Sequence, residues 1–293
     1  MRLLTLAFAT LLAFSVHAEQ SSITEADGYS CMGVDNSRKE TENLALQDAK
    51  RNAVEFSKTY IQSETEMQNF ELKKDLVQAF SKANVQVIEV VSEQWDEPGT
   101  GDCYNIRIKA EVIPAKEEMQ KVVSSGAMLD DPTAPLNVTV WTNKKEYVDG
   151  EQVKIYLKAN KPFYGRLIYL DASGNQYQIL PNRYRNTNYF NGGVMYEYPT
   201  GADNFTLSIS GPYGKEKILV YASTAELGPL QANDLGPVLE IKEKQVARAT
   251  RGISISKKTP GEAGGGNAAL NIRPTVAEFA EASVEITTRA SGA

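Results

Sequence analysis

The stretch from Arg183 to Gly193 combines residue types that often supply binding energy at protein surfaces. It contains Tyr184, Tyr189 and Phe190 together with Arg183 and Arg185, and three asparagines lie between or beside them. Tyr and Arg are enriched at binding hot spots, and Asn side chains both donate and accept hydrogen bonds. Because the rings follow no helix or strand period, we expect a loop with at least two of them exposed. The alternative is an ordinary hairpin connection whose rings fold back on the core.

The chain lacks histidine after residue 17, so catalytic and metal sites that need a histidine are not expected there. The only histidine is His17, which lies in a segment expected to be removed. Ser-His-Asp and Cys-His catalysis, HExxH zinc sites and His-ligated haem all need this side chain. Ser254 and Lys257 have the Ser-x-x-Lys spacing of penicillin-recognising enzymes, but the partner motifs of those enzymes are missing. We therefore expect a protein that is not an enzyme and that holds no cofactor and no metal.

Carboxylates and lysines offer weaker alternatives. An acidic group near one expected hairpin could attract calcium, but it lacks the spaced Asp-x-Asp loop with its glycine. A hydrolase could use carboxylates alone, with two acidic groups about 5 to 9 Å apart across a cleft. Lysines on and near one strand could meet an anionic polymer or an acidic protein, although solvated residues that protect a strand edge are the favoured interpretation. The acidic residues are Glu89, Glu93, Asp96, Glu97 and Asp102, and the basic ones Lys144, Lys145, Lys154, Lys158 and Lys161.

Cys31 and Cys103 are the only cysteines of the chain. In an oxidising compartment two thiols of one domain usually pair. They lie in the first and last expected strands of one small sheet, so we expect a disulfide. Two separately buried small side chains are the alternative.

Residues 1–18 have the pattern of a cleavable export signal. Met1-Arg2 is a positive start, Leu3 to Val16 is apolar, and Val16-His17-Ala18 fits the small-x-small cleavage rule. Cleavage would make Glu19 the first residue, and no cysteine stands there to carry a lipid. No later stretch approaches the roughly 20 apolar residues of a membrane span. We expect a periplasmic or secreted protein.

The charge distribution argues against nucleic acid as a partner. Residues 19–127 contain 12 Lys and Arg against 20 Asp and Glu, whereas residues 128–293 contain 18 against 17. An acidic half and a neutral half provide no basic surface for a phosphate backbone.

Residues 19–123 are expected to form an α+β domain. Ser37 and Glu40 have the spacing of a capping box, and the helix that follows has Ala45, Ala49 and Ala53 on one face. A second helix from Phe70 to Phe80 and two strands, Val85 to Trp95 and Asp102 to Val112, follow. The order of strand, two helices and hairpin indicates helices on one face of a small sheet.

An all-β sandwich is expected over residues 136–293, after a linker at 124–135. Val153, Ile155, Leu157 and Ala159 alternate with polar residues, which is typical of a strand with one buried face. Further strands are predicted at 138–141, 166–171, 176–180, 194–198, 205–209, 217–221, 252–256 and 283–288, between turns typical of sandwiches. Residues 257–274 are expected to be a glycine-rich loop.

Two resemblances accompany these patterns. The segment GEQVKIYLKANKPFYGRLIYLDASGNQYQILPN resembles the family called domain of unknown function 4384, which implies a β-rich domain and no settled activity. The segment GYSCMGVDNSRKETENLALQDAKRNAVEFSKTYI resembles the amino-terminal domain of flagellar assembly protein T and related envelope lipoproteins, over about residues 24–115. The chain departs from that family after this domain.

Together these observations predict an exported envelope protein that acts by binding, as an accessory or assembly component with an envelope protein partner. The alternative is a secreted β-sandwich module that recognises a glycan or a peptide through the tyrosine-rich loop.

Overall fold

The structure is a computed structural model that describes residues 19–34, 36–65, 70–96, 101–124, 126, 128, 130–236, 238–252 and 276–292. The expected signal segment 1–18, the glycine-rich loop 257–274 and residues 253–256 of an expected strand lie outside these ranges.

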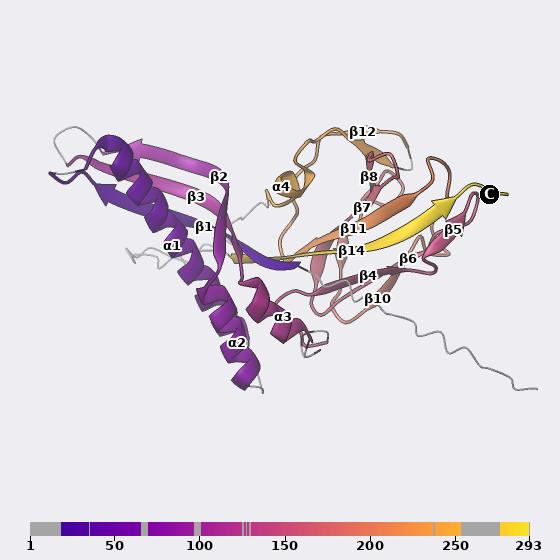
Figure 1. Cartoon of the computed structure of the whole chain (residues 1–293), viewed down its shortest axis with the longest axis horizontal. Helices are drawn as coiled ribbons and strands as arrows, with labels where there is room; N and C mark the ends of the chain where they lie inside the picture. Colours follow the sequence, from indigo (N-terminus) through magenta and orange to yellow (C-terminus); the bar gives the residue numbers. More distant parts are fainter. Residues whose placement is uncertain are drawn as a thin grey trace, which may run out of the picture.

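The amino-terminal part contributes three antiparallel strands with helix α1 along one face, while α2 packs against α1 and α3 (Figure 1). The strands lie in the order β1-β3-β2, and α1 contacts both β1 and β3. The predicted order of strand, two helices and hairpin is confirmed. The elements are β1 (Glu19–Cys31), α1 (Arg38–Glu64), α2 (Phe70–Ser81), β2 (Asn84–Trp95), β3 (Cys103–Ile113) and α3 (Lys116–Ser124).

Helix α1 begins at the predicted capping box and packs closely on β1. The Ser37 amide donates to Glu40 Oε2 at 2.7 Å, and the Glu40 amide donates to Ser37 Oγ at 3.3 Å. The face toward the sheet carries the fully buried alanines Ala45, Ala49 and Ala53, as the sequence predicts. Gly28 of β1 lies beneath them, and a Cβ at this position would stand 2.0 Å from the Ala45 carbonyl oxygen.

The described residues of the carboxy-terminal part are rich in strands and include one short helix. Its elements are β4 (Val138–Thr142), β5 (Glu146–Val148), β6 (Ile155–Ala159), β7 (Phe163–Leu170), β8 (Gln176–Leu180), β9 (Tyr189–Phe190), β10 (Met195–Tyr198), β11 (Lys215–Ser223), β12 (Ala232–Asp234), β13 (Leu239–Ile241), α4 (Val246–Thr250) and β14 (Val276–Arg289).

One eleven-stranded sheet runs through both parts of the described chain. Its main path is β12-β13-β8-β7-β11-β14-β1-β3-β2, and β5 and β9 pair at its sides. The last strand, β14, lies antiparallel to β11 and to the first strand, with Glu19–Thr24 opposite Val276–Glu281. The expected α+β part followed by a β-rich part is confirmed in outline. The exact domain limits stay a prediction, because strands from both parts share this sheet.

A second sheet, β10-β6-β4, faces the carboxy-terminal half of the large one across a common apolar core. The predicted alternation in β6 is confirmed, since Ile155, Leu157 and Ala159 are buried and the residues between them are partly exposed. A second core lies between helices α1 and α2 and the amino-terminal strands. A third core lies around Ile23 and Phe279 on the opposite face of the large sheet, and Val246 of α4 belongs to it.

Several elements differ from the prediction. Residues 205–209 do not form the expected strand, because only Ser208 makes a β-bridge, to Gln152. This segment still follows 150–153 through backbone hydrogen bonds, including Val153 N to Leu207 O at 2.8 Å and Ile209 N to Glu151 O at 2.9 Å. The elements α3, α4, β5, β12 and β13 were not predicted from sequence, and β9 lies within the expected Arg183 to Gly193 loop.

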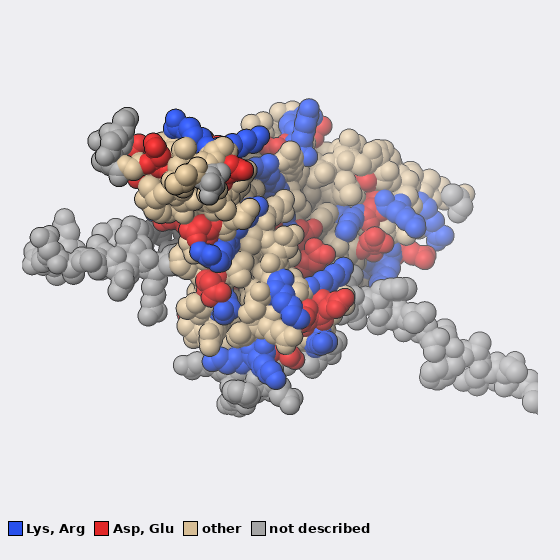
Figure 2. Space-filling model, turned by 60° about the vertical axis from the view of Figure 1, so that its left-hand side comes forward, with Lys and Arg blue, Asp and Glu red and all other residues tan. Residues whose placement is uncertain are grey.

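Acidic and basic side chains are interspersed on the face shown in Figure 2. None of the helices in the described ranges is both long and apolar enough to cross a membrane.

Candidate functional site

The Arg183 to Gly193 loop exposes two of its three rings. The Tyr184 side chain is 54% exposed and that of Tyr189 is 48% exposed. Each ring packs on a different neighbour: Tyr184 on Phe205 with centroids 5.8 Å apart, and Tyr189 on Tyr164 at 5.2 Å. The expectation that at least two rings reach solvent is therefore met by the structure.

Asn182, which is buried, holds the first turn of this loop. Its Oδ1 accepts hydrogen bonds from the amides of Tyr184, at 2.9 Å, and Arg185, at 2.8 Å. Its Nδ2 donates to the Ile179 carbonyl at 3.0 Å and to Tyr198 Oη at 2.9 Å. Because the backbone beside Tyr184 is fixed to the core, the ring is presented with little loss of backbone freedom on binding.

The two arginines have different surroundings. Arg183 is exposed. Arg185 is half-buried, pairs with Asp203 at 3.4 Å and lies over the Tyr198 ring at 5.5 Å. Arg185 therefore stabilises the loop, and Arg183 is the arginine of this loop that faces solvent.

Phe190 requires a correction, because its ring belongs to the core. It is 2% exposed, and it stacks on Phe163 with centroids 5.0 Å apart. Gly165 leaves the space that the ring fills, since a Cβ at Gly165 would lie 2.8 Å from Phe190 Cε2. Strand β9, which pairs with β7, turns this side chain inward while its neighbour Tyr189 faces outward.

Most of the lysines on and near β6 that the sequence analysis singled out form ion pairs with carboxylates. Lys144 pairs with Glu151 at 2.6 Å and Lys158 with Asp130 at 2.5 Å. Lys154 pairs with Glu197 across β6 and β10. Paired lysines on a sheet surface fit the interpretation of a solvated face better than that of a polyanion site.

The acidic group near the β2–β3 hairpin is also engaged locally. Glu93 accepts a hydrogen bond from Tyr104 Oη at 2.7 Å, Asp96 accepts one from Asn105 Nδ2 at 2.8 Å, and Glu89 lies 3.6 Å from Lys109. Glu97 lies outside the described residues. Among the described residues, no group of three or more His, Cys, Asp or Glu side chains could hold a metal ion.

Cys31 and Cys103 form the expected disulfide, and they stand directly opposite each other in β1 and β3. The disulfide joins the last paired residues of β1 and β3. It is remote in sequence from the Arg183 to Gly193 loop.

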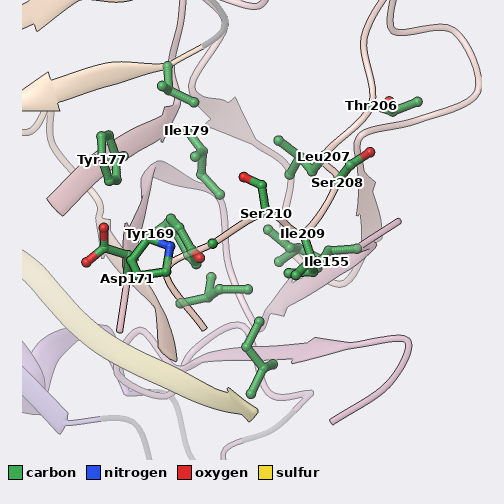
Figure 3. A pocket seen from close by; sticks show the side chains of 16 residues that line it. Ile155, Tyr169, Asp171, Tyr177, Ile179, Thr206, Leu207, Ser208, Ile209 and Ser210 are labelled. Atoms are coloured by element: carbon green, nitrogen blue, oxygen red, sulfur yellow. The ribbon is translucent and has the colours of Figure 1, made fainter. Parts of the chain in front are cut away.

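A cavity of about 300 Å³ lies between the two sheets of the carboxy-terminal part (Figure 3). Tyr169, Asp171 and Tyr177 stand on one side of it, and the 206–210 segment stands on the other. The small sheet has three strands among the described residues. The cavity lies where the irregular 206–212 segment, and not a strand of the small sheet, faces the large sheet. Sequence reasoning missed this site, because the expected strand 205–209 would have closed the gap.

The cavity has an apolar floor and no carboxylate without a partner. Asp171 accepts from the amides of Ser173 and Asn175 at 2.9 and 2.8 Å, and from Asn175 Nδ2 at 2.9 Å. Tyr169 donates to buried Glu216 at 2.6 Å, and burial and this hydrogen bond raise the pKa of Tyr169. The floor is formed by Val153, Ile155, Ile179, Ile209, Ile218 and Ile286.

Comparison with known proteins identifies one segment of the chain. Residues 146–226 match the family described as Domain of unknown function (DUF4384), which agrees with the predicted resemblance of the carboxy-terminal part. This segment contains the tyrosine loop and most of the cavity lining. The comparisons with curated proteins and with solved structures find no match. The resemblance of residues 24–115 to flagellar assembly protein T therefore stays a prediction.

Proposed function

We propose that the protein is an exported component of the bacterial cell envelope that acts by binding another envelope protein through Tyr184 and Tyr189. The observation that carries this proposal is the exposure of both rings on a loop whose backbone is fixed by Asn182. Exposed aromatic residues on a rigid support are typical of binding hot spots. The two facing sheets, which we take as a β-sandwich, would be the scaffold that presents this loop.

Export is supported by two features at the amino terminus. Residues 1–18 have the signal pattern, and the Cys31–Cys103 disulfide suits an oxidising compartment. Strand β1 begins at Glu19, which is exposed, and Gln20 is buried. Cleavage after Ala18 would therefore leave the pairing of β1 intact.

A non-enzymatic role is supported by the residue types that the chain offers. Residues 19–293 contain no histidine, and the two cysteines pair with each other. The accessory or assembly role rests on the resemblance of residues 24–115 to an envelope assembly protein.

A second candidate function is recognition of a glycan. Trp141 of β4 and Tyr156 of β6 stack across the outer face of the small sheet, with centroids 5.7 Å apart and planes at 19°. Both rings are partly exposed, and such a pair can stack on the apolar face of a sugar.

Site-specific cross-linking in the native envelope tests the proposal. A photoreactive benzoylphenylalanine replaces Tyr189 in the exported chain, and the matched control replaces Tyr213, an exposed tyrosine on another turn. We expect position 189 to trap one protein of defined mass and position 213 to trap none. No product at position 189, or equal products at both positions, would overturn the proposal. A polysaccharide adduct at a photoreactive residue in place of Tyr156 would favour the second candidate.

A further inference from the structure

The inter-sheet cavity combines a continuous apolar floor with a mouth that opens to solvent. Ile155 belongs to the small sheet, and Val153 lies in the segment just before it. Ile179, Ile218 and Ile286 belong to the large sheet. Ser208 and Ser210 at the mouth are exposed, so the cavity is reached from outside. The Tyr169 and Tyr177 rings stack with centroids 6.3 Å apart and form one wall.

The carboxylates at and beside the cavity accept hydrogen bonds from neutral donors within the protein. Asp171 caps its own turn, and Glu216 accepts hydrogen bonds from Tyr169 and from Thr288 Oγ1, at 2.6 and 2.8 Å. No lysine or arginine is among the residues that line the cavity in the described part of the chain. An anionic ligand would therefore lose its hydration beside the Asp171 carboxylate without gaining an ionic partner.

The size of the cavity sets the size of an occupant. An apolar cavity of about 150 Å³ is large enough to take up benzene. At about 300 Å³, this cavity holds roughly twice that volume, which corresponds to two fused aromatic rings or an equivalent hydrocarbon. Small-molecule sites commonly start at this volume.

We infer that this cavity is a binding site for a mainly apolar small molecule of about two aromatic rings that carries no negative charge. Burial of apolar surface against the isoleucine floor supplies affinity, and the stacked tyrosines provide a flat wall. The exposed hydroxyl groups of Ser208 and Ser210 can solvate a single polar end of the ligand at the mouth. This inference does not depend on the partner of the tyrosine loop, because neither Tyr184 nor Tyr189 lines the cavity.

The test compares two naphthalene probes on the full exported chain at neutral pH. They are 2-naphthol, which is neutral, and 2-naphthoate, which is anionic. Isoleucine δ1-methyl NMR reports the location, and titration of the shifts gives the affinities. We expect 2-naphthol to shift the methyls of Ile155, Ile179 and Ile218 and to leave those of Ile61 and Ile108, in the amino-terminal core, unmoved. We expect 2-naphthoate to bind at least about tenfold more weakly than 2-naphthol.

A matched pair of substitutions tests the position of the site. Leu207→Trp fills the cavity from its wall, whereas Leu219→Trp places the same side chain on the opposite face of the large sheet. We expect Leu207→Trp to weaken 2-naphthol binding at least about tenfold and Leu219→Trp to change it less than about twofold.

Three results would overturn the inference. They are no shift of the lining methyls by 2-naphthol, equal affinity for 2-naphthoate, and unchanged binding in folded Leu207→Trp protein. If Leu207→Trp does not fold, the location of the methyl shifts and the ranking of the probes on the native chain decide the question.

Discussion

Lys161 Nζ lies 2.9 Å from Glu278 Oε1, and both side chains are largely buried, with exposed fractions of 12% and 3%. The other Glu278 oxygen accepts the Leu136 amide at 2.5 Å, and Tyr60 of α1 also hydrogen-bonds to this carboxylate. One carboxylate on β14 therefore connects helix α1, the residue that follows the expected linker and the β6–β7 turn.

Lys161→Met should destabilise the protein by about 3 kcal/mol, because it leaves the buried Glu278 carboxylate without its cation. The matched control is Lys158→Met, since its partner Asp130 is well exposed and the pair is a surface ion pair. We expect the control to cost less than about 1 kcal/mol. Urea unfolding of both variants measures the difference. Similar small losses for the two variants would show that the Glu278 junction is not a stabilising element.

Gly28→Ala should also be strongly destabilising. The new methyl group would overlap the Ala45 carbonyl oxygen and the Ala49 amide, so α1 would have to move away from the sheet. Overpacking of this kind costs about 3 kcal/mol. Gly33→Ala is the control, because the nearest atom to a Cβ there is 4.0 Å away. Thermal unfolding compares them, and equal melting temperatures would contradict the close approach of helix and strand.

The stability of the protein should fall as the pH rises above about 10, the usual range of tyrosine ionisation. Burial, with a smaller contribution from Glu281, raises the pKa of Tyr221 to about 12, while Arg251 and Arg166 oppose this shift. Between pH 10 and 12 the unfolded state loses the Tyr221 proton and the folded state keeps it, so ionisation favours unfolding.

The pH effect can be isolated with Tyr221→Phe. Ionisation of Tyr221 lowers the free energy of unfolding by about 2 to 3 kcal/mol between pH 10 and 12. The free energy of unfolding of the variant should therefore fall less over this range, by about that amount. Denaturant unfolding at several alkaline pH values measures the slopes. Parallel slopes for the native and variant chains would show that Tyr221 ionises equally in both states.

The compartment is tested by the chemistry of the purified exported protein. We expect Edman sequencing to start at Glu19, and alkylation without reductant to label neither Cys31 nor Cys103. A chain that retains Met1, or one with two alkylated thiols, would contradict export to an oxidising compartment.

Local patterns predicted the local structure well. The capping box at Ser37 and the alanine face predicted helix α1, and the alternation at Ile155 to Ala159 predicted β6. The disulfide followed from the expected adjacency of the strands that carry Cys31 and Cys103. The helix and β6 depend on neighbours in sequence, whereas the disulfide, whose cysteines are 72 residues apart, followed from the expected order of elements in one small domain.

Long-range features could not be predicted from the same patterns. The pairing of β1 with β14 joins residues at opposite ends of the chain, and no local period encodes it. Helices α3 and α4 were missed because they are short, at 9 and 5 residues, so each shows little periodicity. Phe190 is buried because Gly165 on another strand makes room for its ring, a relation that only the register between β9 and β7 reveals.

The most direct test of the account measures partner affinity and stability together in Tyr184→Ala/Tyr189→Ala. With the partner trapped at position 189, we expect the double variant to bind at least about 2 kcal/mol more weakly, the scale of a hot spot. Its melting temperature should stay near that of the native chain, and the Tyr213→Ala control should change neither quantity. Unchanged affinity would contradict the account, and so would a loss of stability of about 3 to 5 kcal/mol, which would place the two rings in the core.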